Sequence, residues 1–266
     1  MIDWRHWHNE PYLIGGLVFC GWIYALCVGP LRPLLAPSAT FSRAHAWRFY
    51  GALVSFYLAV GSPLDQIGER FLFSAHMVQH LLLIYPAAVL WIWGLPSWLV
   101  DAVGRHMPTL GRVLLHPLVC GLTYIFVQSA WHVPALYDWA LQDKFVHVVE
   151  HVTFFLGALL FWWPLMAPST VWPPVRHGLR MVYLVVVGVG MTPLFAFIAF
   201  SPDVLYPTYE YAPRIINDFS AAEDQLLAGV IMKLGSVIMT FVALTVIFYQ
   251  WYRASERRGP GMFNHR

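Results

Sequence analysis

Seven runs of apolar residues dominate this chain and determine the class of fold it can adopt. Most of them approach the length of about 20 residues that an α-helix needs to cross the hydrocarbon core of a bilayer. The second and fourth runs are short and need their flanking residues to complete a span. Together they predict an all-α integral membrane protein. The runs are Tyr12–Gly29, Ala46–Val60, Phe71–Trp93, His116–Trp131, Phe145–Leu165, Leu179–Phe200 and Leu226–Trp251.

The composition fits a membrane protein better than a soluble domain. Hydrophobic residues make up 59% of the 266 residues, charged residues make up 11%, and the mean hydropathy is +0.58. The net charge of +2 is too small to indicate a nucleic-acid partner. The opening residues MIDWRHWHNE lack a basic segment leading into a short apolar core, so we expect no removable signal peptide. We expect residues 1–266 to form a single domain, a seven-transmembrane-helix bundle in the lipid bilayer.

The distribution of arginines orients the predicted bundle. Short cytoplasmic loops carry an excess of Lys and Arg, and alternate loops of this chain show such an excess. The bias predicts that the N-terminus, residues 1–11, lies outside, on the periplasmic side, and that the basic tail, residues 253–266, lies in the cytoplasm. The arginines on the predicted cytoplasmic side are Arg32, Arg43, Arg48, Arg105, Arg112, Arg176, Arg180, Arg253, Arg257, Arg258 and Arg266.

Two pairs of histidines interrupt the apolar runs. His76 and His80 lie near the start of the third run, and His147 and His151 repeat the same four-residue spacing in the fifth. Residues four apart share one face of a helix. An ionisable side chain in hydrocarbon is unfavourable unless it faces the bundle interior and finds a partner there, which marks it as a functional-site hypothesis.

The predicted topology brings more metal-binding side chains to the same depth. The third and fifth runs both begin at the outer face, and the fourth ends there at His132. At about 1.5 Å per residue, all five of these histidines fall in the outer leaflet. The sequence therefore predicts a metal site made of His76, His80, His132, His147 and His151. Possible additional ligands or orienting partners are Asp224, Glu150, Met77 and Met232.

The residue types narrow the choice of metal. Neutral imidazoles with a carboxylate or thioether nearby suit copper, while zinc and haem iron remain alternatives, and metals that prefer oxygen ligands are excluded. Glu150 is a candidate ligand, but we favour a role as the acceptor that orients an imidazole. His6 and His8 are candidates for capturing metal at the entrance, although a solvated terminus is the favoured reading of that segment.

Two further residues in the apolar runs call for a structural explanation. Pro193 predicts a kink in the sixth run, because proline cannot donate the backbone hydrogen bond of a regular helix. Lys233 is a charge within the seventh run and needs a partner, for which we expect an ion pair.

Four segments resemble the CtaG-type family of cytochrome c oxidase assembly factors. They are SPLDQIGERFLFSAHMVQHLLL, WHVPALYDWAL, HVVEHVTFFLGALLFWWPL and DQLLAGVIM, and they follow the family's order from Ser62 to Met232. The resemblance implies a seven-span protein of a bacterial cytoplasmic (inner) membrane that helps to mature haem-copper oxidases. It also implies functional roles for His76, His80, His132, His147, His151 and Asp224.

The leading functional hypothesis is a copper-handling assembly factor, more a metallochaperone than an enzyme, for which we predict no catalytic residue. It would bind copper from the periplasmic side and pass it to cytochrome c oxidase subunits or to a periplasmic copper chaperone. The main alternative is a haem-binding or quinone-linked membrane oxidoreductase that uses the same histidines as axial ligands. A copper permease and a diiron enzyme rank lower. The sequence does not determine which metal binds, in which oxidation state, or whether one ion or two are bound. It also does not determine which oxidase metal centre is served or whether the chain forms a homodimer.

Overall fold

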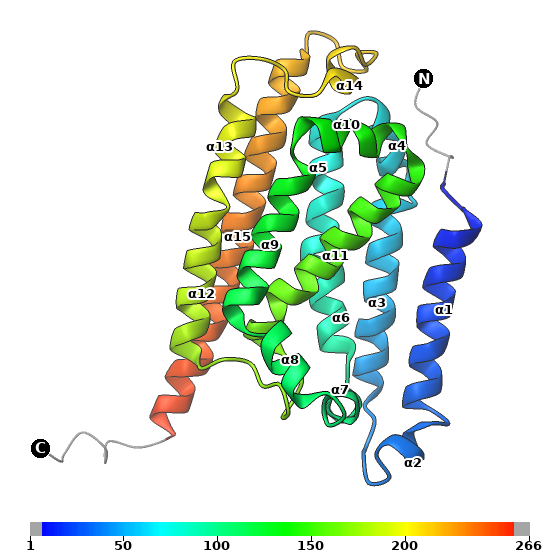
Figure 1. The fold of residues 1–266 in the computed structure, drawn as a ribbon, viewed down its shortest axis with the longest axis vertical. Helices are drawn as coiled ribbons and strands as arrows, with labels where there is room; N and C mark the ends of the chain where they lie inside the picture. Colours follow the sequence, from blue (N-terminus) through cyan, green and yellow to red (C-terminus); the bar gives the residue numbers. More distant parts are fainter. Residues whose placement is uncertain (1–6, 258–266) are drawn as a thin grey trace, which may run out of the picture.

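The computed structural model describes residues 7–257, and the regular structure within that range is entirely helical. The helices are α1 (Pro11–Val28), α2 (Arg32–Leu35), α3 (Arg43–Val60), α4 (Pro63–Arg70), α5 (Phe73–Leu82), the π-helical η1 (Leu83–Ala87), α6 (Ala88–Gly94), α7 (Ser97–Gly104), α8 (Pro108–Leu114), α9 (Pro117–Trp131), α10 (Pro134–Gln142), α11 (Lys144–Met166), α12 (His177–Gly190), α13 (Thr192–Phe200), α14 (Pro207–Glu210) and α15 (Ala221–Glu256). The long helices run side by side, and α4, α10 and α14 gather at one end of them (Figure 1).

Five helical segments are long and apolar enough to cross a membrane, and α5–η1–α6 and α12–α13 each count as one of them. The bent pair α8 and α9, with 53° between its two parts, gives a sixth if it forms a single span. α3 is as long as α1, at 18 residues, but is not among them; it carries Arg43 and Arg48 in its first turns. An all-helical protein with five or six candidate spans is thus confirmed. The count of seven spans and the orientation remain predictions.

The outer surface of the long helices is apolar. Large hydrophobic side chains with exposed fractions of 50% or more include Phe19 of α1, Phe126 of α9, Val186 of α12 and Phe241 of α15. Soluble proteins rarely expose continuous apolar surface on this scale. The polar side chains of the long helices, in contrast, include several that are fully buried. This distribution is the one expected of a bundle surrounded by lipid.

α5, η1 and α6 form one continuous helical path despite Pro86. The turn that contains Pro86 is a π-helix, and Pro86 lies inside it. A wider turn accommodates the proline ring and the missing backbone N–H without ending the helix. The indole of Trp162 on α11 donates to the carbonyl of Ile84 in this turn, at 2.9 Å. The π-turn therefore also ties α5 to α11, the two helices that carry the histidine pairs.

The sixth apolar run is interrupted as predicted, just before Pro193. α12 ends at Gly190, and α13 begins at Thr192. Lys233 of α15 donates to the Thr192 hydroxyl at 2.9 Å, and its ammonium lies 5.4 Å from the centroid of the Phe195 ring. The partner of this charge is thus a hydroxyl and an aromatic face at the helix break, rather than the ion pair we expected.

α4 packs very closely against the first turns of α5. A Cβ atom placed on Gly68 would lie 2.3 Å from Oε1 of Gln79 and 3.0 Å from the Cα of His76. The carbonyl of Gly68 also accepts a hydrogen bond of 2.7 Å from the Tyr209 hydroxyl. Only glycine fits this approach, and it determines how near α4 lies to the histidine pair of α5.

Replacing Gly68 by alanine should therefore destabilise the protein, because the added methyl group pushes against Gln79 and the backbone of His76. We expect a loss of about 1–3 kcal/mol, as for other overpacked sites, measured as a lower thermal unfolding midpoint in detergent. Gly188→Ala is the matched control, because nothing lies within 4 Å of a Cβ at Gly188. Equal unfolding midpoints for the two variants would contradict the close approach of α4 and α5.

Candidate metal site

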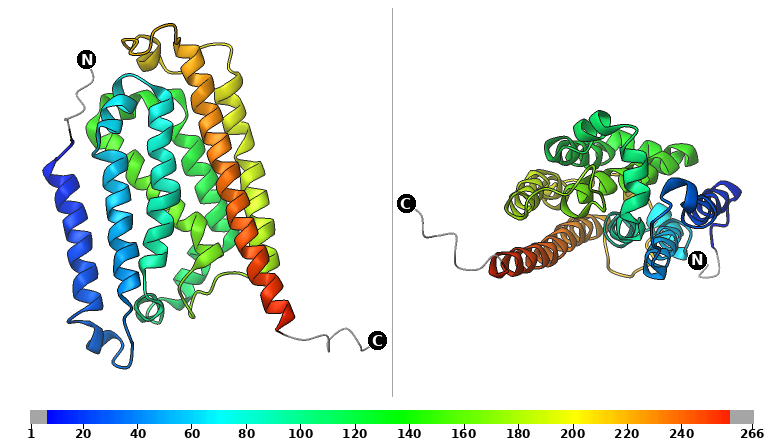
Figure 2. Two further views of the ribbon diagram at one scale, coloured as in Figure 1. Left: turned by 180° about the vertical axis from the view of Figure 1, so that it is seen from behind. Right: turned by 90° about the horizontal axis from the view of Figure 1, so that it is seen from below.

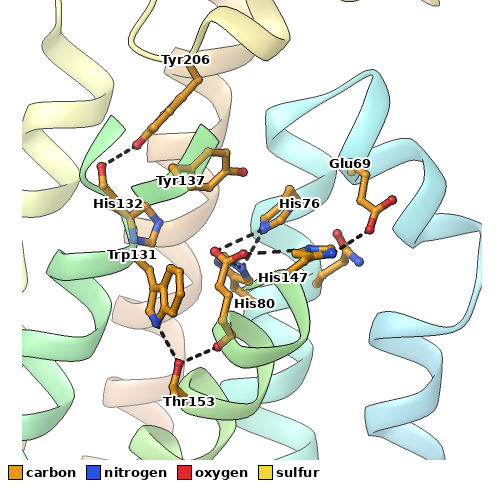
Figure 3. Close-up of polar contacts among 12 residues, drawn as sticks. Glu69, His76, His80, Trp131, His132, Tyr137, His147, Thr153 and Tyr206 are labelled. Carbon is orange, nitrogen blue, oxygen red and sulfur yellow. Dashed lines mark hydrogen bonds and ion pairs between the residues drawn. The ribbon is translucent and has the colours of Figure 1, made fainter. Parts of the chain in front are cut away.

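Three segments supply the histidines of the site. His76 and His80 lie on α5, His147 and His151 lie on α11, and His132 caps the C-terminal end of α9. α11 packs against α9 and α10, and also against η1 and α6, which continue α5. All five imidazoles are buried. The structure therefore brings together the whole histidine set that the sequence predicts, below the segments α4, α10 and α14 (Figures 1 and 3).

The two histidines of α5 are in direct contact. Their Nε2 atoms are 2.8 Å apart, and the rings meet edge to face with centroids 4.4 Å apart. Two ligand atoms on one tetrahedral zinc-like ion lie about 3.4 Å apart, so these nitrogens must separate slightly before both bind one ion. The His80 ring also stacks on Phe154, with centroids 4.1 Å apart. Phe154 thus covers one face of His80 with apolar surface.

Glu150 lies at the centre of the cluster and is 1% exposed. Its Oε1 is 3.7 Å from Nε2 of His80 and 3.9 Å from Nε2 of His76, and its Oε2 is 3.9 Å from Nε2 of His147. These separations are too long for hydrogen bonds and slightly longer than the spacing of two ligands on one ion. The carboxylate is near enough to be a ligand, and both this role and the orienting role remain predictions.

Four residues come within reach of a single ion. One ligand atom from each of His76, His147, Glu150 and His151 lies within 4.8 Å of the others. His132 lies beyond them, beside His80, with ring centroids 5.9 Å apart. The cluster is therefore extended, and it holds more ligands than one tetrahedral ion requires.

Most polar atoms of these side chains lack a hydrogen-bond partner. An unpaired buried polar group costs about 1–3 kcal/mol, and native proteins leave few of them. Neutral imidazoles with a carboxylate form a donor set that suits copper or zinc. The residues present therefore fit a transition metal. The atoms are Nδ1 of His76 and His80, Nε2 of His132, His147 and His151, and both carboxylate oxygens of Glu150.

His132 is oriented as metal-binding histidines commonly are. Its Nδ1 lies 2.7 Å from the carbonyl of Gln128, one turn earlier on α9. Nδ1 must carry the proton to donate to that carbonyl, which leaves Nε2 as an unprotonated acceptor. The neighbouring Trp131 donates to the Thr153 hydroxyl of α11 at 2.8 Å (Figure 3). This bond helps to hold the end of α9 beside the part of α11 that carries Glu150.

Three buried tyrosines cover the cluster on the side of α10 and α14. The Tyr137 ring lies 5.2 Å from the His76 ring and contacts Tyr206 and Tyr209. The Tyr137 and Tyr209 hydroxyls are 2.9 Å apart, and the Tyr206 hydroxyl donates to the carbonyl of His132 at 3.0 Å. These contacts separate the histidines from the loop that precedes α15 and keep the cluster dry on that side.

A second set of polar groups lies between the cluster and the N-terminal segment. Nδ1 of His147 is 2.7 Å from Oε1 of Glu69, and His8 pairs with Asp65. The buried Gln79 side chain donates to Asp65 at 2.7 Å. One ligand atom from each of Asp65, Glu69 and His147 lies within 4.8 Å of the others. His147 therefore belongs to both groups.

Contacts within this second set favour the charged forms of His8 and Glu69, whereas burial raises the pKa of Asp65 and favours its neutral form. The hydrogen bond to Asp65 raises the pKa of His8 above its ordinary value, although partial burial opposes this. Burial would raise the pKa of Glu69, but the hydrogen bond and the charge of His147 outweigh it and lower that pKa. Both directions favour the charged forms of His8 and Glu69. The Glu69–His147 pair holds α4 against α11, and the His8–Asp65 contact holds the N-terminal segment against α4.

A cavity of about 440 Å³ runs beside this region, between α1 and α11. Its lining is apolar over most of its extent, with Leu17, Phe56 and Phe155 among the wall residues. Near the N-terminal segment it reaches polar groups from both sets: His8, Asp65, Glu69, His147 and His151. The cavity therefore connects the outer polar groups with two ligands of the buried cluster, His147 and His151.

The remaining predicted residues lie at other positions. Both carboxylate oxygens of Asp224 accept backbone N–H groups at the start of α5, from Phe73 at 2.6 Å and Ser74 at 3.1 Å. Met77 and Met232 are buried in the main hydrophobic core. His6 lies outside the described residues.

Sequence reasoning did not single out Asp65, Glu69 or Tyr137 as part of the site. Glu69 reaches His147 because α4 folds back against α5, and the only sequence signal for that turn is Gly68 and the short polar segment around it. Tyr137 reaches His76 because α10 turns sharply after α9, at Pro134. Both residues stand within the motifs quoted above, but their spacing does not mark them.

The family model that matches this chain is described as cytochrome c oxidase caa3 assembly factor (Caa3_CtaG). The match covers residues 22–254, which include all five buried histidines, Glu150 and Glu69. No curated protein and no solved structure matches the chain significantly.

Replacing Asp224 by alanine should destabilise α5, because two backbone N–H groups at its start lose their acceptor. We expect a loss of about 1–3 kcal/mol and a smaller loss for Asp224→Asn, which keeps one acceptor oxygen. Thermal unfolding of metal-free protein in detergent measures this effect. If Asp224 only caps α5, the folded Asn variant keeps the metal content of wild type. Loss of metal at wild-type stability would identify Asp224 as a ligand.

Proposed function

This chain belongs to the cytochrome c oxidase caa3 assembly factor family, and on that premise we propose that it binds copper in the buried histidine cluster and hands it on during oxidase maturation. The observation that carries the proposal is the group of His76, His147, Glu150 and His151, which bring one ligand atom each within 4.8 Å of one another while both carboxylate oxygens of Glu150 lack a hydrogen-bond partner. A protein that assembles a copper-containing oxidase has a direct use for such a site. The proposal assigns the chain a metallochaperone role and no catalytic residue.

The arrangement of the ligands supports holding and release rather than permanent binding. They come from α5, α9 and α11, so small shifts between helices change the number of ligands on the ion. The separations of 3.7 to 3.9 Å around Glu150 require only a small contraction to bring ligands onto one ion. Copper is preferred over zinc because the family serves a copper oxidase, and haem iron remains the alternative.

We further propose that the bundle crosses a bacterial cytoplasmic membrane seven times, with α3 as the additional span and residues 1–11 on the periplasmic side. The arginine excess in alternate loops supports this orientation. The cluster then lies in the outer leaflet and receives copper from the periplasm. The proposed recipients are cytochrome c oxidase subunits or a periplasmic copper chaperone.

Purified protein from copper-replete cells should contain near-stoichiometric copper. His76→Ala and His147→Ala should each weaken copper binding by about tenfold or more, because the loss of even an indirect partner of a ligand costs about 10–100-fold in metal affinity. The purified variants should therefore retain clearly less copper than wild type after dialysis against copper-free buffer. Elemental analysis of detergent-purified protein measures this. His116→Ala is the matched control, because His116 lies at the start of α9, where its ring accepts from the backbone of Leu118.

Wild-type protein without copper under these conditions would contradict the proposal. A visible spectrum separates the haem alternative, because a haem protein shows a strong Soret band and a sharp α-band on reduction, whereas a copper protein without haem shows neither. Equal copper loss in His116→Ala would show that the bound copper is adventitious.

The proposed orientation predicts the behaviour of C-terminal fusions. A fluorescent protein fused after residue 257 should fluoresce, and alkaline phosphatase fused at the same point should be inactive, because the latter folds only outside the cytoplasm. A phosphatase fused before residue 11, with its own export signal, should be active. An even number of spans would place both ends on the same side and give matching results for the two termini.

A further inference from the structure

His147 presents one ring nitrogen to each of two groups of ligands. Nδ1 lies 2.7 Å from Oε1 of Glu69, whereas Nε2 faces the buried cluster, 3.9 Å from Oε2 of Glu150. An imidazole offers a lone pair at either nitrogen, depending on which one carries the proton. The two groups are therefore separated by a single side chain.

The outer group has the composition of a metal site. Asp65, Glu69 and His147 bring one ligand atom each within 4.8 Å of one another, and Nδ1 of His8 contacts Asp65. Two imidazole nitrogens with two carboxylates suit zinc or copper(II), which accept mixed nitrogen and oxygen ligands. Gln79, itself fully buried, donates to Asp65 Oδ1 while the other oxygen of that carboxylate meets His8. Such a donor is the kind of partner that fixes a metal-binding carboxylate.

The side chains of the outer group become more accessible toward the N-terminal segment. The exposed fraction is 4% for Asp65 and 8% for His147, but 17% for His8 and 23% for Glu69. The cavity beside α1 is lined by all four of them and by His151 of the buried cluster. A route thus leads from partly exposed ligands to fully buried ones.

We propose that His8, Asp65, Glu69 and His147 form a second site for a divalent transition-metal cation, an outer site that loads the buried cluster through His147. This proposal rests on the proposed function, since the buried cluster is the recipient. The ion binds first to the outer carboxylates and imidazoles, with Nδ1 of His147 as a shared ligand. It then moves to the Nε2 side of the same ring, where His151, His76 and Glu150 complete its coordination. Nε2 gives up its proton to solvent in this step, and Nδ1 takes one up from solvent and donates it in a hydrogen bond to Glu69, so that the ring stays neutral.

The experiment is a titration of metal-free, tag-free full-length protein in detergent with Cu²⁺, followed by equilibrium dialysis. Wild type should bind in two classes, a tight one in the buried cluster and a weaker one in the outer site. Glu69→Gln keeps a hydrogen-bond acceptor for His147 but removes the negative charge, and His8→Ala removes one ligand and the partner of Asp65 without changing any residue of the helices. Each should weaken the second class by about tenfold or more and slow loading of the tight class at limiting Cu²⁺.

Two further variants separate this proposal from the one on which it rests. His151→Ala should abolish the tight class and leave the weaker class intact, because His151 is not among the outer ligands and reaches them only through its ring contact with His147, at 4.2 Å between centroids. Glu10→Gln is the matched control: Glu10 also lines the cavity but pairs with Lys144, so both classes should be unchanged.

A single class lost in His151→Ala and unaffected by Glu69→Gln and His8→Ala would overturn the outer site and leave the proposed function standing. If wild type bound Cu²⁺ only in the weaker class and His151→Ala had no effect on it, the proposed function would be contradicted. The proposed transfer would be contradicted with it. If Glu10→Gln weakened the second class of Cu²⁺ binding as much as Glu69→Gln does, the outer site would be overturned. The general negative charge of the cavity would then account for the binding.

Discussion

Glu150 imposes the electrostatic constraint on which the rest of this site depends. A carboxylate removed from water is costly unless it is hydrogen-bonded or paired with a cation, and both oxygens of Glu150 lack a hydrogen-bond partner. The nearest polar groups are imidazoles, three of them within 4 Å. In the proposed site, a metal ion between the carboxylate and the imidazoles would supply the missing partners and a compensating positive charge together. Loss of that ion would leave the buried carboxylate without a partner again.

The surrounding structure holds the backbone of this region firmly and leaves the ligands themselves loosely paired. Asp224 fixes the first turn of α5, Gly68 sets the distance to α4, and the Trp131–Thr153 bond joins α9 to α11. None of these contacts uses a histidine nitrogen that faces the cluster. Rigid support with adjustable ligands is what a site needs in order to hold a metal and later release it.

The helices and the convergence of the histidines could be predicted from the sequence. Apolar runs of sufficient length form helices in a membrane, because a helix satisfies its own backbone hydrogen bonds where no water is available. The predicted outer ends of these helices then place His76, His132 and His147 at one depth. The sequence marks Glu150 as a candidate ligand or orienting partner, but its position at the centre of the cluster could not be predicted. In HVVEH it falls one residue before His151, and the apolar pattern defines the rotation of α11 too coarsely to say whether it faces inward. The role of Asp224 could not be predicted either. The sequence places it at the depth of the histidines, but its carboxylate accepts from the backbone at the start of α5, where Ser74 is 150 positions away in the chain.

The position of His147 would allow the proposed buried site to exchange a metal without a large opening. Phe154 and the tyrosines Tyr137 and Tyr206 close two sides, and α9 closes a third. The remaining side faces the cavity along α1, where Glu69 already holds the outer nitrogen of His147. The proposed transfer across this ring would exchange the outer ligands for His151, His76 and Glu150. An ion on this route would keep polar ligands close by and would avoid the cost of exposure to hydrocarbon.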